Sequence, residues 1–519
     1  MIVSGLLSHV GYIRLRGNAR TEVTGITCDS REVSQGSLFV CLPGCKQDGH
    51  IFAAEAIERG ASAVVMEEGN PEAERLEKQF STMSKAHEET ALILVASTRK
   101  VFSPLAAAFY GYPLRSLISV AVTGTKGKTT TAYMLRGILE EAGYQTGLIG
   151  TNGAFLGERR LPISHTTPEA HELQRILREM KDSGCTHVVM EVSSQGIKME
   201  RVADLHFNCG IFTNLSPDHI GPGEHENFED YLYQKSRLFL NCDVGIINRD
   251  DKWAKDVTGK ASCRLVTYGL SEGDYWAEHP VCYKDSKMLG CEYQLRSTSL
   301  DQDLDAKEST GEQADSETIF LPLPGEYNIR NSLAAIGAAK ELGVSFRMAA
   351  KALSQVKVPG RMEVVSGTNH LWILVDYAHN EDSMENLLKT LKSYEPRRLL
   401  CVFGCGGNRS VLRRTGMGRA AGALADISVA TEDNSRYEPL EEILSAIVEG
   451  LKEGIQKSGG TYVVIPDRRE AIGYAIRHGK MGDIIAIIGK GHEEYQETNG
   501  RRIPFSDREE AKRALLTYK

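Results

Sequence analysis

The sequence of 519 residues predicts an α/β protein of three domains. Apolar runs of strand length alternate with segments of helical period along most of the chain, which is typical of parallel sheets covered by helices. Polar, glycine-rich clusters follow several of these runs, at the strand ends where such sheets bind ligands. Stretches typical of linkers occur at 111–113 and 359–360. We therefore place the domains at residues 1–112, 113–356 and 357–519.

The composition restricts the class of function. A net charge of −8 argues against nonspecific nucleic-acid binding, and 41% hydrophobic with 25% charged residues is typical of a soluble globular protein. The sequence has neither a run of about 18 apolar residues nor a signal-peptide pattern, so we expect a cytoplasmic protein without stable membrane insertion. The eleven cysteines are scattered and mostly flanked by apolar residues, which indicates reduced core thiols.

The first domain is predicted to be a small α/β unit. Strands are expected at 37–42, 63–66 and 92–96, helices at 52–59 and 99–109, and an exposed helix with flanking loops within 67–89. Asp29-Ser30-Arg31 precedes these elements. Taken alone, the pattern suits any ligand-binding module.

The second domain begins with a strand, a glycine-containing loop and a helix. The apolar run 117–122 predicts a buried parallel strand, and a helical pattern follows Lys128 and ends at Gly143. The loop between them would face an anion with its amides and with the positive helix end. Lys128 would add a charge, and the Thr129 hydroxyl could ligate Mg²⁺. The strict phosphate-loop pattern has glycine where Val122 stands, so an ordinary strand-to-helix turn is the alternative.

Two further strands of this domain end in polar clusters. The strand 187–190 leads to Glu191-Val192-Ser193-Ser194, and the strand 209–213 leads to the polar run 214–219. Glu191, close to a phosphate-bound cation, is a candidate Mg²⁺ ligand. A solvated glutamate at a strand end is the alternative.

Helix signals place other polar residues of this domain. Thr167 and Pro168 suit the N-cap and the first position of a helix. Asn227 suits the N-cap of a later helix that carries Lys235 near its apolar face, where a lysine usually extends its charge to solvent.

Residues 268–320 break the βα alternation. Their short alternating stretches predict an antiparallel excursion, and the acidic, Ser-rich run 297–318 predicts a mobile loop. A helix is expected at 332–342.

The third domain is predicted to be a second doubly wound, Rossmann-like sheet. Its strands are expected at 372–375, 398–403, 427–430 and 484–488, each followed by a polar cluster. Two arginines, an asparagine and a glutamate in these clusters would suit a zwitterionic ligand, because guanidinium pairs with carboxylate and glutamate with ammonium. No Gly-x-Gly-x-x-Gly follows the first strand, which argues against dinucleotide binding.

Together, these clusters resemble the Mur ligase family, the ATP-dependent amide-forming enzymes of peptidoglycan precursor assembly. The resemblance covers nearly the whole chain and is greatest to the ligases that add a diamino acid to UDP-N-acetylmuramoyl-L-alanyl-D-glutamate. It implies a first domain that binds the UDP-sugar, a central phosphate-loop domain that binds ATP and a C-terminal domain that binds the amino acid. The motifs that carry it, in order, are Asp-Ser-Arg (29–31), Gly-Thr-Lys-Gly-Lys-Thr-Thr (124–130), Thr-Thr-Pro (166–168), Glu-Val-Ser-Ser (191–194), Asn-Leu-Ser-Pro-Asp-His (214–219), Asn328 and Asn331, Pro-Gly-Arg-Met-Glu (359–363), Asp-Tyr-Ala-His-Asn (376–380), Phe-Gly-Cys-Gly-Gly (403–407) and Gly-Lys-Gly-His-Glu (489–493).

The resemblance also implies roles for individual residues. The residues implied to bind ATP are Gly124, Thr125, Lys126, Gly127, Lys128, Thr129, Thr130, Asn331, Arg361, Asp376 and His379. Those implied to bind the UDP-sugar peptide are Ser30, Thr166, Thr167, Ser193 and Arg201. One Mg²⁺ would be held by Thr129 and Glu191, and a second by His219 and Lys235. Lys235 would be carbamylated by CO₂, because a carbamate offers Mg²⁺ the carboxylate that an ammonium lacks. The implied catalytic residues are Lys128, Glu191, His219 and Lys235.

The implied amino-acid contacts favour one substrate. They are Arg409, Asn434, Arg436, Gly489 and Glu493. Family members that use meso-diaminopimelate carry Asp-Asn-Pro-Arg, and this chain has Asp433-Asn434-Ser435-Arg436. Lysine lacks a distal carboxylate and would leave guanidinium groups unmatched, at a cost of about 1–3 kcal/mol. We therefore favour meso-diaminopimelate.

Three departures from the family pattern affect the expected specificity. Ser435 replaces proline, which is expected to loosen the backbone before Arg436. Residues 220–225 differ from the usual Leu-Asp-Tyr-His-Gly, and Met199 stands at a commonly polar position.

Other functions stay open. The same ligase chemistry with L-lysine or another amino acid is one alternative. A nucleotide-binding paralogue that does not ligate is another, although the retained catalytic residues argue against it. Folate-polyglutamate ligases lack a first domain with Asp-Ser-Arg. We expect a monomer that acts on small-molecule substrates and binds no nucleic acid.

Overall fold

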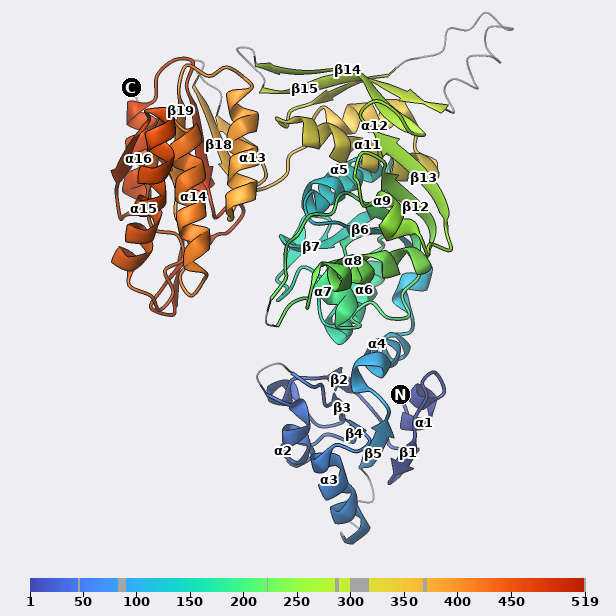
Figure 1. Cartoon of the computed structure of the whole chain (residues 1–519). Coiled ribbons are helices and arrows are strands. Elements are labelled where there is room, and N and C mark those ends of the chain that lie inside the picture. The colour runs from blue at the N-terminus through green and yellow to red at the C-terminus, as the bar shows by residue number, and fades with distance from the viewer. Residues whose placement is uncertain are drawn as a thin grey trace, which may run out of the picture. The chain divides into compact units, whose positions relative to one another are not determined.

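The structure is a computed structural model, which describes residues 1–44, 47–82, 90–221, 223–284, 289–298, 317–366 and 371–517. The chain separates into two compact units, Met1–Thr267 and Tyr268–Lys519. Figure 1 labels the helices and strands along the chain. This division falls within the second predicted domain, so the boundaries after residues 112 and 356 stay predictions. None of the helices in the described ranges combines the length and apolar character needed to span a membrane.

The first sheet of the Met1–Thr267 unit has the strand order β1-β5-β4-β3-β2. β2 to β5 are parallel, and β1 pairs antiparallel with β5. The strands predicted for the first domain are confirmed as β3, β4 and β5, whose side chains are buried because helices cover the sheet. The strands are β1 (Arg14–Arg16), β2 (Gly25–Thr27), β3 (Ser37–Val40), β4 (Ala63–Glu67) and β5 (Ala91–Val95). The helices are α1 (Val3–Leu7), η1 (Ser30–Glu32), η2 (Gly49–Phe52), α2 (Ala53–Glu58), α3 (Pro71–Thr82) and α4 (Thr98–Phe109).

The second sheet of this unit is centred on β6, the strand before the predicted phosphate loop. β6 pairs parallel with β10 on one side and with β11 on the other, and the order continues as β12-β11-β6-β10-β7-β8-β9. This arrangement confirms the predicted parallel sheet. The strands are β6 (Ile118–Thr123), β7 (Thr146–Gly150), β8 (Gly153–Leu156), β9 (Arg159–Leu161), β10 (His187–Glu191), β11 (Phe207–Phe212), β12 (Cys242–Asn248) and β13 (Arg264–Gly269), which crosses the boundary between the units. The helices are η4 (Pro113–Ser116), α5 (Lys128–Glu141), α6 (Ala170–Asp182), α7 (Ser194–Lys198), α8 (Phe228–Ser236), η5 (Arg237–Leu240) and α9 (Ala254–Thr258).

The N-cap predicted at Thr167 is wrong. α6 begins at Ala170, and its N-cap is Glu169, whose side chain accepts a hydrogen bond from the Ala170 amide. The Thr167 hydroxyl is buried and donates to the carbonyl oxygen of Glu191 at 3.0 Å. Thr167 therefore binds the end of β10 and does not cap the helix, whereas Asn227 caps α8 as predicted.

The Tyr268–Lys519 unit begins with the predicted antiparallel excursion. β14 (Tyr275–Lys284) and β15 (Leu289–Ser297) pair antiparallel, and β16 (Thr318–Leu321) pairs antiparallel with β15. The predicted acidic loop lies largely at 299–316, outside the described residues. α11 (Glu326–Glu341) begins six residues before the predicted start at 332, and α12 (Phe346–Leu353) follows it.

The last sheet has the strand order β17-β18-β22-β19-β20-β21. The four predicted strands, β18, β22, β19 and β20, are parallel neighbours, so their carboxyl ends share one edge. Sequence reasoning missed β17, which is antiparallel to β18, and β21, which extends the parallel sheet. The strands are β17 (Glu363–Ser366), β18 (Trp372–Asp376), β19 (Leu399–Phe403), β20 (Ile427–Ala430), β21 (Thr461–Val464), β22 (Ile484–Ile488), β23 (Tyr495–Thr498) and β24 (Arg501–Pro504). The helices are α13 (Glu381–Lys392), α14 (Val411–Leu424), α15 (Leu440–Ser458), α16 (Arg468–His478) and α17 (Asp507–Leu516).

Candidate active site

The predicted phosphate loop connects β6 to α5. Gly124 follows the strand with φ 147°, and Gly127, with φ 84°, is the N-cap of α5. A Cβ on Gly124 would lie 1.9 Å from Oγ1 of Thr213, the residue after β11, so only glycine permits this close approach of the loop. The expected order of strand, loop and helix N-terminus is present. The Thr125 and Lys126 amides donate to the carbonyl oxygen and Oδ1 of Asn214, at 2.8 and 2.9 Å, so it is the N-terminus of α5 that suits an anion.

Two lysines meet at one carbonyl oxygen of this loop. Lys128 Nζ lies 2.8 Å from the Gly124 oxygen and 3.1 Å from that of Thr125. Lys235 Nζ, which is buried, also lies 2.8 Å from the Gly124 oxygen. Burial and the neighbouring Lys128 ammonium lower the pKa of Lys235 well below its ordinary value. Lys235 is therefore buried beside the phosphate loop, where its surroundings favour the neutral amine, and it does not reach solvent.

A buried carboxylate lies beside the first turn of α5. Thr129 Oγ1 donates to Glu191 Oε2 at 3.0 Å, which the parallel pairing of β10 with β6 makes possible. The Thr151 amide donates to Glu191 Oε1 at 2.9 Å, and the Thr151 hydroxyl to Oε2 at 3.1 Å. Hydroxyl and carboxylate oxygens are the ligands that Mg²⁺ prefers, so Thr129 and Glu191 fit a magnesium ion. Sequence reasoning missed Thr151, because no motif marks it.

Thr151 joins this carboxylate to the residues expected to bind the UDP-sugar peptide. Its hydroxyl lies 3.1 Å from Thr166 Oγ1. Thr167 Oγ1 lies 3.1 Å from Ser193 Oγ, and Arg201 donates to the Thr167 carbonyl oxygen at 3.1 Å. The structure thus brings these four predicted residues together next to Glu191.

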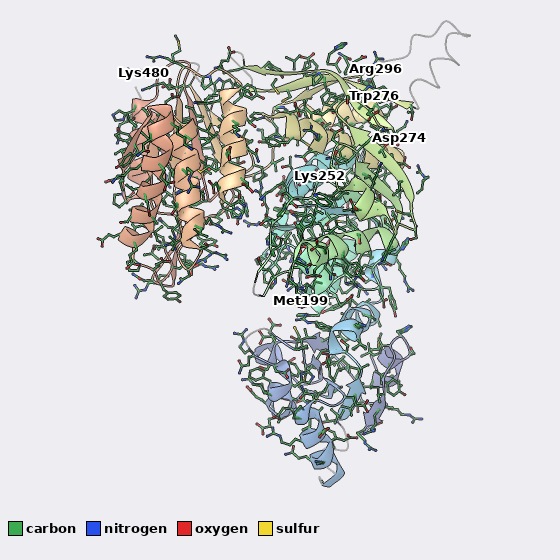
Figure 2. All side chains as sticks on the ribbon, in the orientation of Figure 1. Met199, Lys252, Asp274, Trp276, Arg296 and Lys480 are labelled. Atoms are coloured by element: carbon green, nitrogen blue, oxygen red, sulfur yellow. The ribbon has the colours of Figure 1, made fainter. Side chains whose placement is uncertain are left out.

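The environment of this cluster includes two further features. Glu169 forms ion pairs with Arg201 at 3.4 Å and with Arg99 at 2.9 Å. Because Arg99 belongs to α4, these ion pairs link the cluster to that helix. Met199, labelled in Figure 2, is the half-buried C-cap of α7, the helix that Ser193 caps. Ser30 lies half-buried in η1, and within the described ranges no hydrogen bond joins it to the cluster.

His219 occupies a different environment from Lys235. It is exposed, has φ 55°, and its Nδ1 lies 3.2 Å from Glu224 Oε1. The Tyr231 ring contacts both residues, with its centroid 6.4 Å from the His219 ring and 4.7 Å from Lys235 Nζ. In the described part of the chain no hydrogen bond joins His219 to Lys235, and no group of three or more His, Cys, Asp or Glu side chains is arranged to hold a metal.

The loop that carries His219 is held by a buried histidine that sequence reasoning missed. His225 Nε2 lies 2.9 Å from Ser194 Oγ, and its Nδ1 lies 3.1 Å from Asp230 Oδ2. The His225 amide donates to the His219 carbonyl oxygen at 3.0 Å. His225 therefore fixes the backbone of His219 between α7 and α8.

Three of the residues expected to brace the nucleotide from the second unit, Arg361, Asp376 and His379, lie around the end of β18, and the fourth, Asn331, lies on α11. Asp376 accepts hydrogen bonds from the Met362 and Ala378 amides, each at 2.7 Å, and burial raises its pKa. The Arg361 guanidinium lies 4.7 Å from the Tyr377 ring centroid, and its Nε is buried without a hydrogen-bond partner among the described residues. His379 Nδ1 contacts the Tyr377 carbonyl oxygen at 3.0 Å, and Asn331 donates to Asn328 on α11 at 3.1 Å. An unsatisfied guanidinium nitrogen suits an anionic ligand.

The predicted amino-acid site gathers at the ends of β20 and β22. Asn434 Nδ2 donates to Glu493 Oε2 at 2.8 Å, while Lys490 Nζ donates to Asn434 Oδ1 at 2.8 Å and to Asp433 Oδ1 at 3.2 Å. Burial raises the pKa of Glu493 although the Lys490 ammonium opposes this shift. Lys490 and Asp433 were missed as site residues, yet they orient Asn434 and Glu493.

The arginines of this site lie on neighbouring loops. Arg436, with φ 55°, donates to the Gly407 carbonyl oxygen at 3.1 Å, and Arg409, two residues after Gly407 in the chain, is exposed. Gly489 approaches Asp433 so closely that a Cβ would lie 2.8 Å from Asp433 Oδ2. Ser435, expected to loosen this loop, is buried and donates to Glu432 Oε1 at 2.6 Å, so a hydrogen bond holds the backbone before Arg436.

Comparisons with known proteins agree with this geometry. The family models described as the Mur ligase family catalytic domain, the Mur ligase middle domain and the Mur ligase glutamate ligase domain match residues 22–110, 122–339 and 360–491. Two curated relatives are named UDP-N-acetylmuramoyl-L-alanyl-D-glutamate--2,6-diaminopimelate ligase. That of Caldanaerobacter subterraneus subsp. tengcongensis is 36% identical over 96% of both chains, and that of Syntrophomonas wolfei subsp. wolfei is 38% identical over 95% of both.

A solved structure described by the same ligase name covers 100% of this chain and 99% of its own, with a TM-score of 0.67 and 29% identity. This likeness confirms the predicted three-domain α/β fold with its central phosphate-loop domain. Because three family models match in order and relatives align over nearly their full length, the chain belongs to the Mur ligase family of ATP-dependent, amide-forming ligases.

Proposed function

We propose that this protein adds meso-diaminopimelate to the D-glutamate γ-carboxyl of UDP-N-acetylmuramoyl-L-alanyl-D-glutamate, with conversion of ATP to ADP and phosphate. The names of the relatives support this reaction. The observation that carries it is the position of Thr151, whose hydroxyl contacts both Glu191 of the phosphate site and Thr166 of the acceptor site at 3.1 Å. A phosphoryl donor and a carboxylate acceptor would therefore be bound side by side, as acyl phosphate formation requires.

We propose the following roles for the phosphate-loop residues. The segment from Gly124 to Thr130, with the N-terminus of α5, would hold the phosphates of ATP, and Lys128 would neutralise charge on the transferring phosphoryl group. Thr129 and Glu191 would hold Mg²⁺, which supplies further charge neutralisation when bound. The γ-carboxylate of D-glutamate attacks the γ-phosphorus and ADP leaves. The amine then attacks the acyl carbon, and the tetrahedral intermediate expels phosphate to form the amide.

Lys235 is proposed to carry a carbamate. Its neutral Nζ would bond to the carbon of CO₂ and release one proton, which leaves a carboxylate beside the Lys128 ammonium. Burial and the Lys128 ammonium lower the pKa of Lys235, which supports this step, because only the neutral amine is nucleophilic. With this carbamate, His219 would hold a second Mg²⁺, for which its side chain would have to leave Glu224.

The second unit is proposed to bind the nucleotide and the amino acid. Asn331, Arg361, Asp376 and His379 would contact or brace ATP. In the amino-acid site, Glu493 would pair with an ammonium group, and Arg409 and Arg436 with carboxylates. Asn434 and Gly489 would complete the pocket, with Lys490 fixing the Asn434 amide. We further propose a cytoplasmic monomer.

Trapping of the acyl phosphate tests the reaction. The protein is incubated with ATP, Mg²⁺, the UDP-sugar dipeptide and hydroxylamine in place of the amino acid. We expect a hydroxamate of the dipeptide in amounts equal to the ADP formed, and neither product with Lys128→Met. Release of ADP without any hydroxamate would contradict an acyl phosphate on the D-glutamate side chain.

A further inference from the structure

Two cysteines face each other across the antiparallel pair β14–β15. Cys282 and Cys291 are register partners, and their Sγ atoms lie 3.0 Å apart. Cys282 is exposed, whereas Cys291 is fully buried. We propose that Cys282 and Cys291 form a reversible disulfide modification site, which small-molecule disulfides of the glutathione type oxidise.

The geometry suits a disulfide. Directly opposed residues of antiparallel strands place their Cβ atoms about 4.5–5.5 Å apart, and a disulfide needs about 3.5–4.5 Å. The two sulfurs already point at each other, so bond formation requires only a small movement within one hairpin. This distinguishes the pair from scattered thiols that oxidation could join only by unfolding.

The two thiols also differ in chemistry. The hydrogen bond from the Cys291 thiol lowers the pKa of the exposed Cys282 thiol below its ordinary value, and the same contact with burial raises the pKa of Cys291. The thiolate is the attacking species in disulfide exchange. Cys282 is therefore the residue that meets the oxidant, and Cys291 is the resolving thiol behind it.

The exchange proceeds in two balanced steps. The Cys282 thiolate attacks one sulfur of the small disulfide, which forms a mixed disulfide and releases one small thiolate. Cys291 then loses its proton and attacks the Cys282 sulfur, which forms the Cys282–Cys291 bond and expels the second small thiolate. Overall, two protein thiols are oxidised and one small disulfide is reduced to two thiols, so a dithiol reductant reverses the modification.

The surroundings of the pair couple it to α11. Tyr394 Oη lies 3.5 Å from Cys291 Sγ, donates to the Gly290 carbonyl oxygen at 3.0 Å and accepts from the Gly325 amide at 3.0 Å. Gly325 is the N-cap of α11. Oxidation would draw Cys291 Sγ towards Cys282 and change the hydrogen bonding of this phenol.

The chain contains matched controls. Burial raises the pKa of Cys28 to about 12, and Cys28 is half-buried. Cys242 hydrogen-bonds to Cys263, but burial raises its pKa. Neither Cys28 nor the Cys242–Cys263 pair is therefore expected to react under conditions that oxidise Cys282.

The test uses the reduced full-length protein in glutathione buffers of increasing oxidised fraction, followed by alkylation of free thiols and peptide mapping by mass spectrometry. We expect a cross-linked pair of peptides that contain Cys282 and Cys291, its loss on reduction, and its complete absence in Cys282→Ser. Cys28→Ser should form the cross-link as the wild type does. Equal melting temperatures of the reduced variants show that each is folded.

Three results would overturn the proposal. One is a wild-type protein in which both thiols stay alkylatable at the most oxidising ratio. Another is a glutathione adduct on Cys282 that Cys291 never displaces. The third is preferential oxidation of Cys242 and Cys263.

Discussion

The Glu191 carboxylate accepts hydrogen bonds from Thr129 and from both the amide and the hydroxyl of Thr151. These bonds fix two oxygens at the start of α5, where magnesium would bind. Glu191→Gln keeps the shape but removes the charge, so we expect a loss of turnover of about 100-fold. ADP formation with all substrates measures this effect. Glu140→Gln, on the exposed side of α5, is the control, and equal turnover of the two variants would contradict a role for Glu191.

Lys235 leads to a spectroscopic prediction. Its buried amine, whose pKa is lowered by burial, should take up labelled CO₂, and a carbamate resonance should appear in the ¹³C spectrum of the wild type after incubation with ¹³C-bicarbonate. Lys235→Arg cannot form the adduct and should lose both the resonance and about 100-fold in turnover. Lys255→Arg, on α9, should keep both. A resonance that persists in Lys235→Arg would place the carbamate elsewhere.

Some site residues could be predicted from the sequence and others could not. Thr129 lies in the first turn of a helix, and Glu191 lies at the end of a strand. Each belongs to a motif with fixed spacing, so the sequence marks both. Thr151 and His225 act by contacting another site residue from a separate segment, and Lys490, although it lies in the motif 489–493, acts through its contact with Asn434 of another motif. No spacing or composition reveals such a partner, because the tertiary fold alone brings the two segments together.

At the scale of elements, the loop between β6 and α5 depends on one close approach. Gly124→Ala would place a Cβ 1.9 Å from Thr213 Oγ1 at a φ of 147°. We expect this variant to lose about 1–3 kcal/mol of unfolding free energy, together with ATP affinity. Gly137→Ala, in the interior of α5 with no atom near the added Cβ, should instead gain about 0.5–1 kcal/mol. Chemical unfolding and calorimetric ATP titration distinguish the two variants. A Gly124→Ala variant with wild-type stability and ATP affinity would contradict close approach as the constraint on this loop.

Helices α14 and α15 pack side by side through glycines (Figure 1). A Cβ on Gly450 would lie 2.0 Å from the Thr415 carbonyl oxygen, and one on Gly454 would lie 2.3 Å from that of Arg419. Gly450→Ala should therefore cost about 1–3 kcal/mol in chemical unfolding, because backbone atoms cannot move aside as a side chain can. Glu449→Ala, on the exposed face of α15, should stay within about 0.5 kcal/mol of the wild type. Similar losses in both variants would refute close helix contact as the cause.

The limits of element prediction have physical causes. Buried apolar runs such as β20 and β22 were located to the residue, because both faces of a parallel strand are covered. The start of α11 was placed too late, since two prolines and a glycine precede it and Gly325 caps it without a side-chain signal. Thr167 has the composition of an N-cap, but its hydroxyl is used by β10.

At the scale of the whole molecule, the sequence order of polar clusters predicted which strand ends would meet. In the last sheet, the four clusters follow adjacent parallel strands, so the expected common edge is present. The orientation of each side chain was beyond prediction. Ser435, for example, replaces a proline yet binds Glu432 through its hydroxyl.

The most direct test of the proposed function is phosphate release with ATP, Mg²⁺ and the UDP-sugar dipeptide, run in parallel with meso-diaminopimelate, L-lysine, L-ornithine and no amino acid. Product masses identify the amide formed. The account predicts turnover with meso-diaminopimelate at least about 100-fold above that with lysine, because Arg409 and Arg436 would lack a carboxylate partner in the lysine complex. Turnover with lysine and none with meso-diaminopimelate would contradict it.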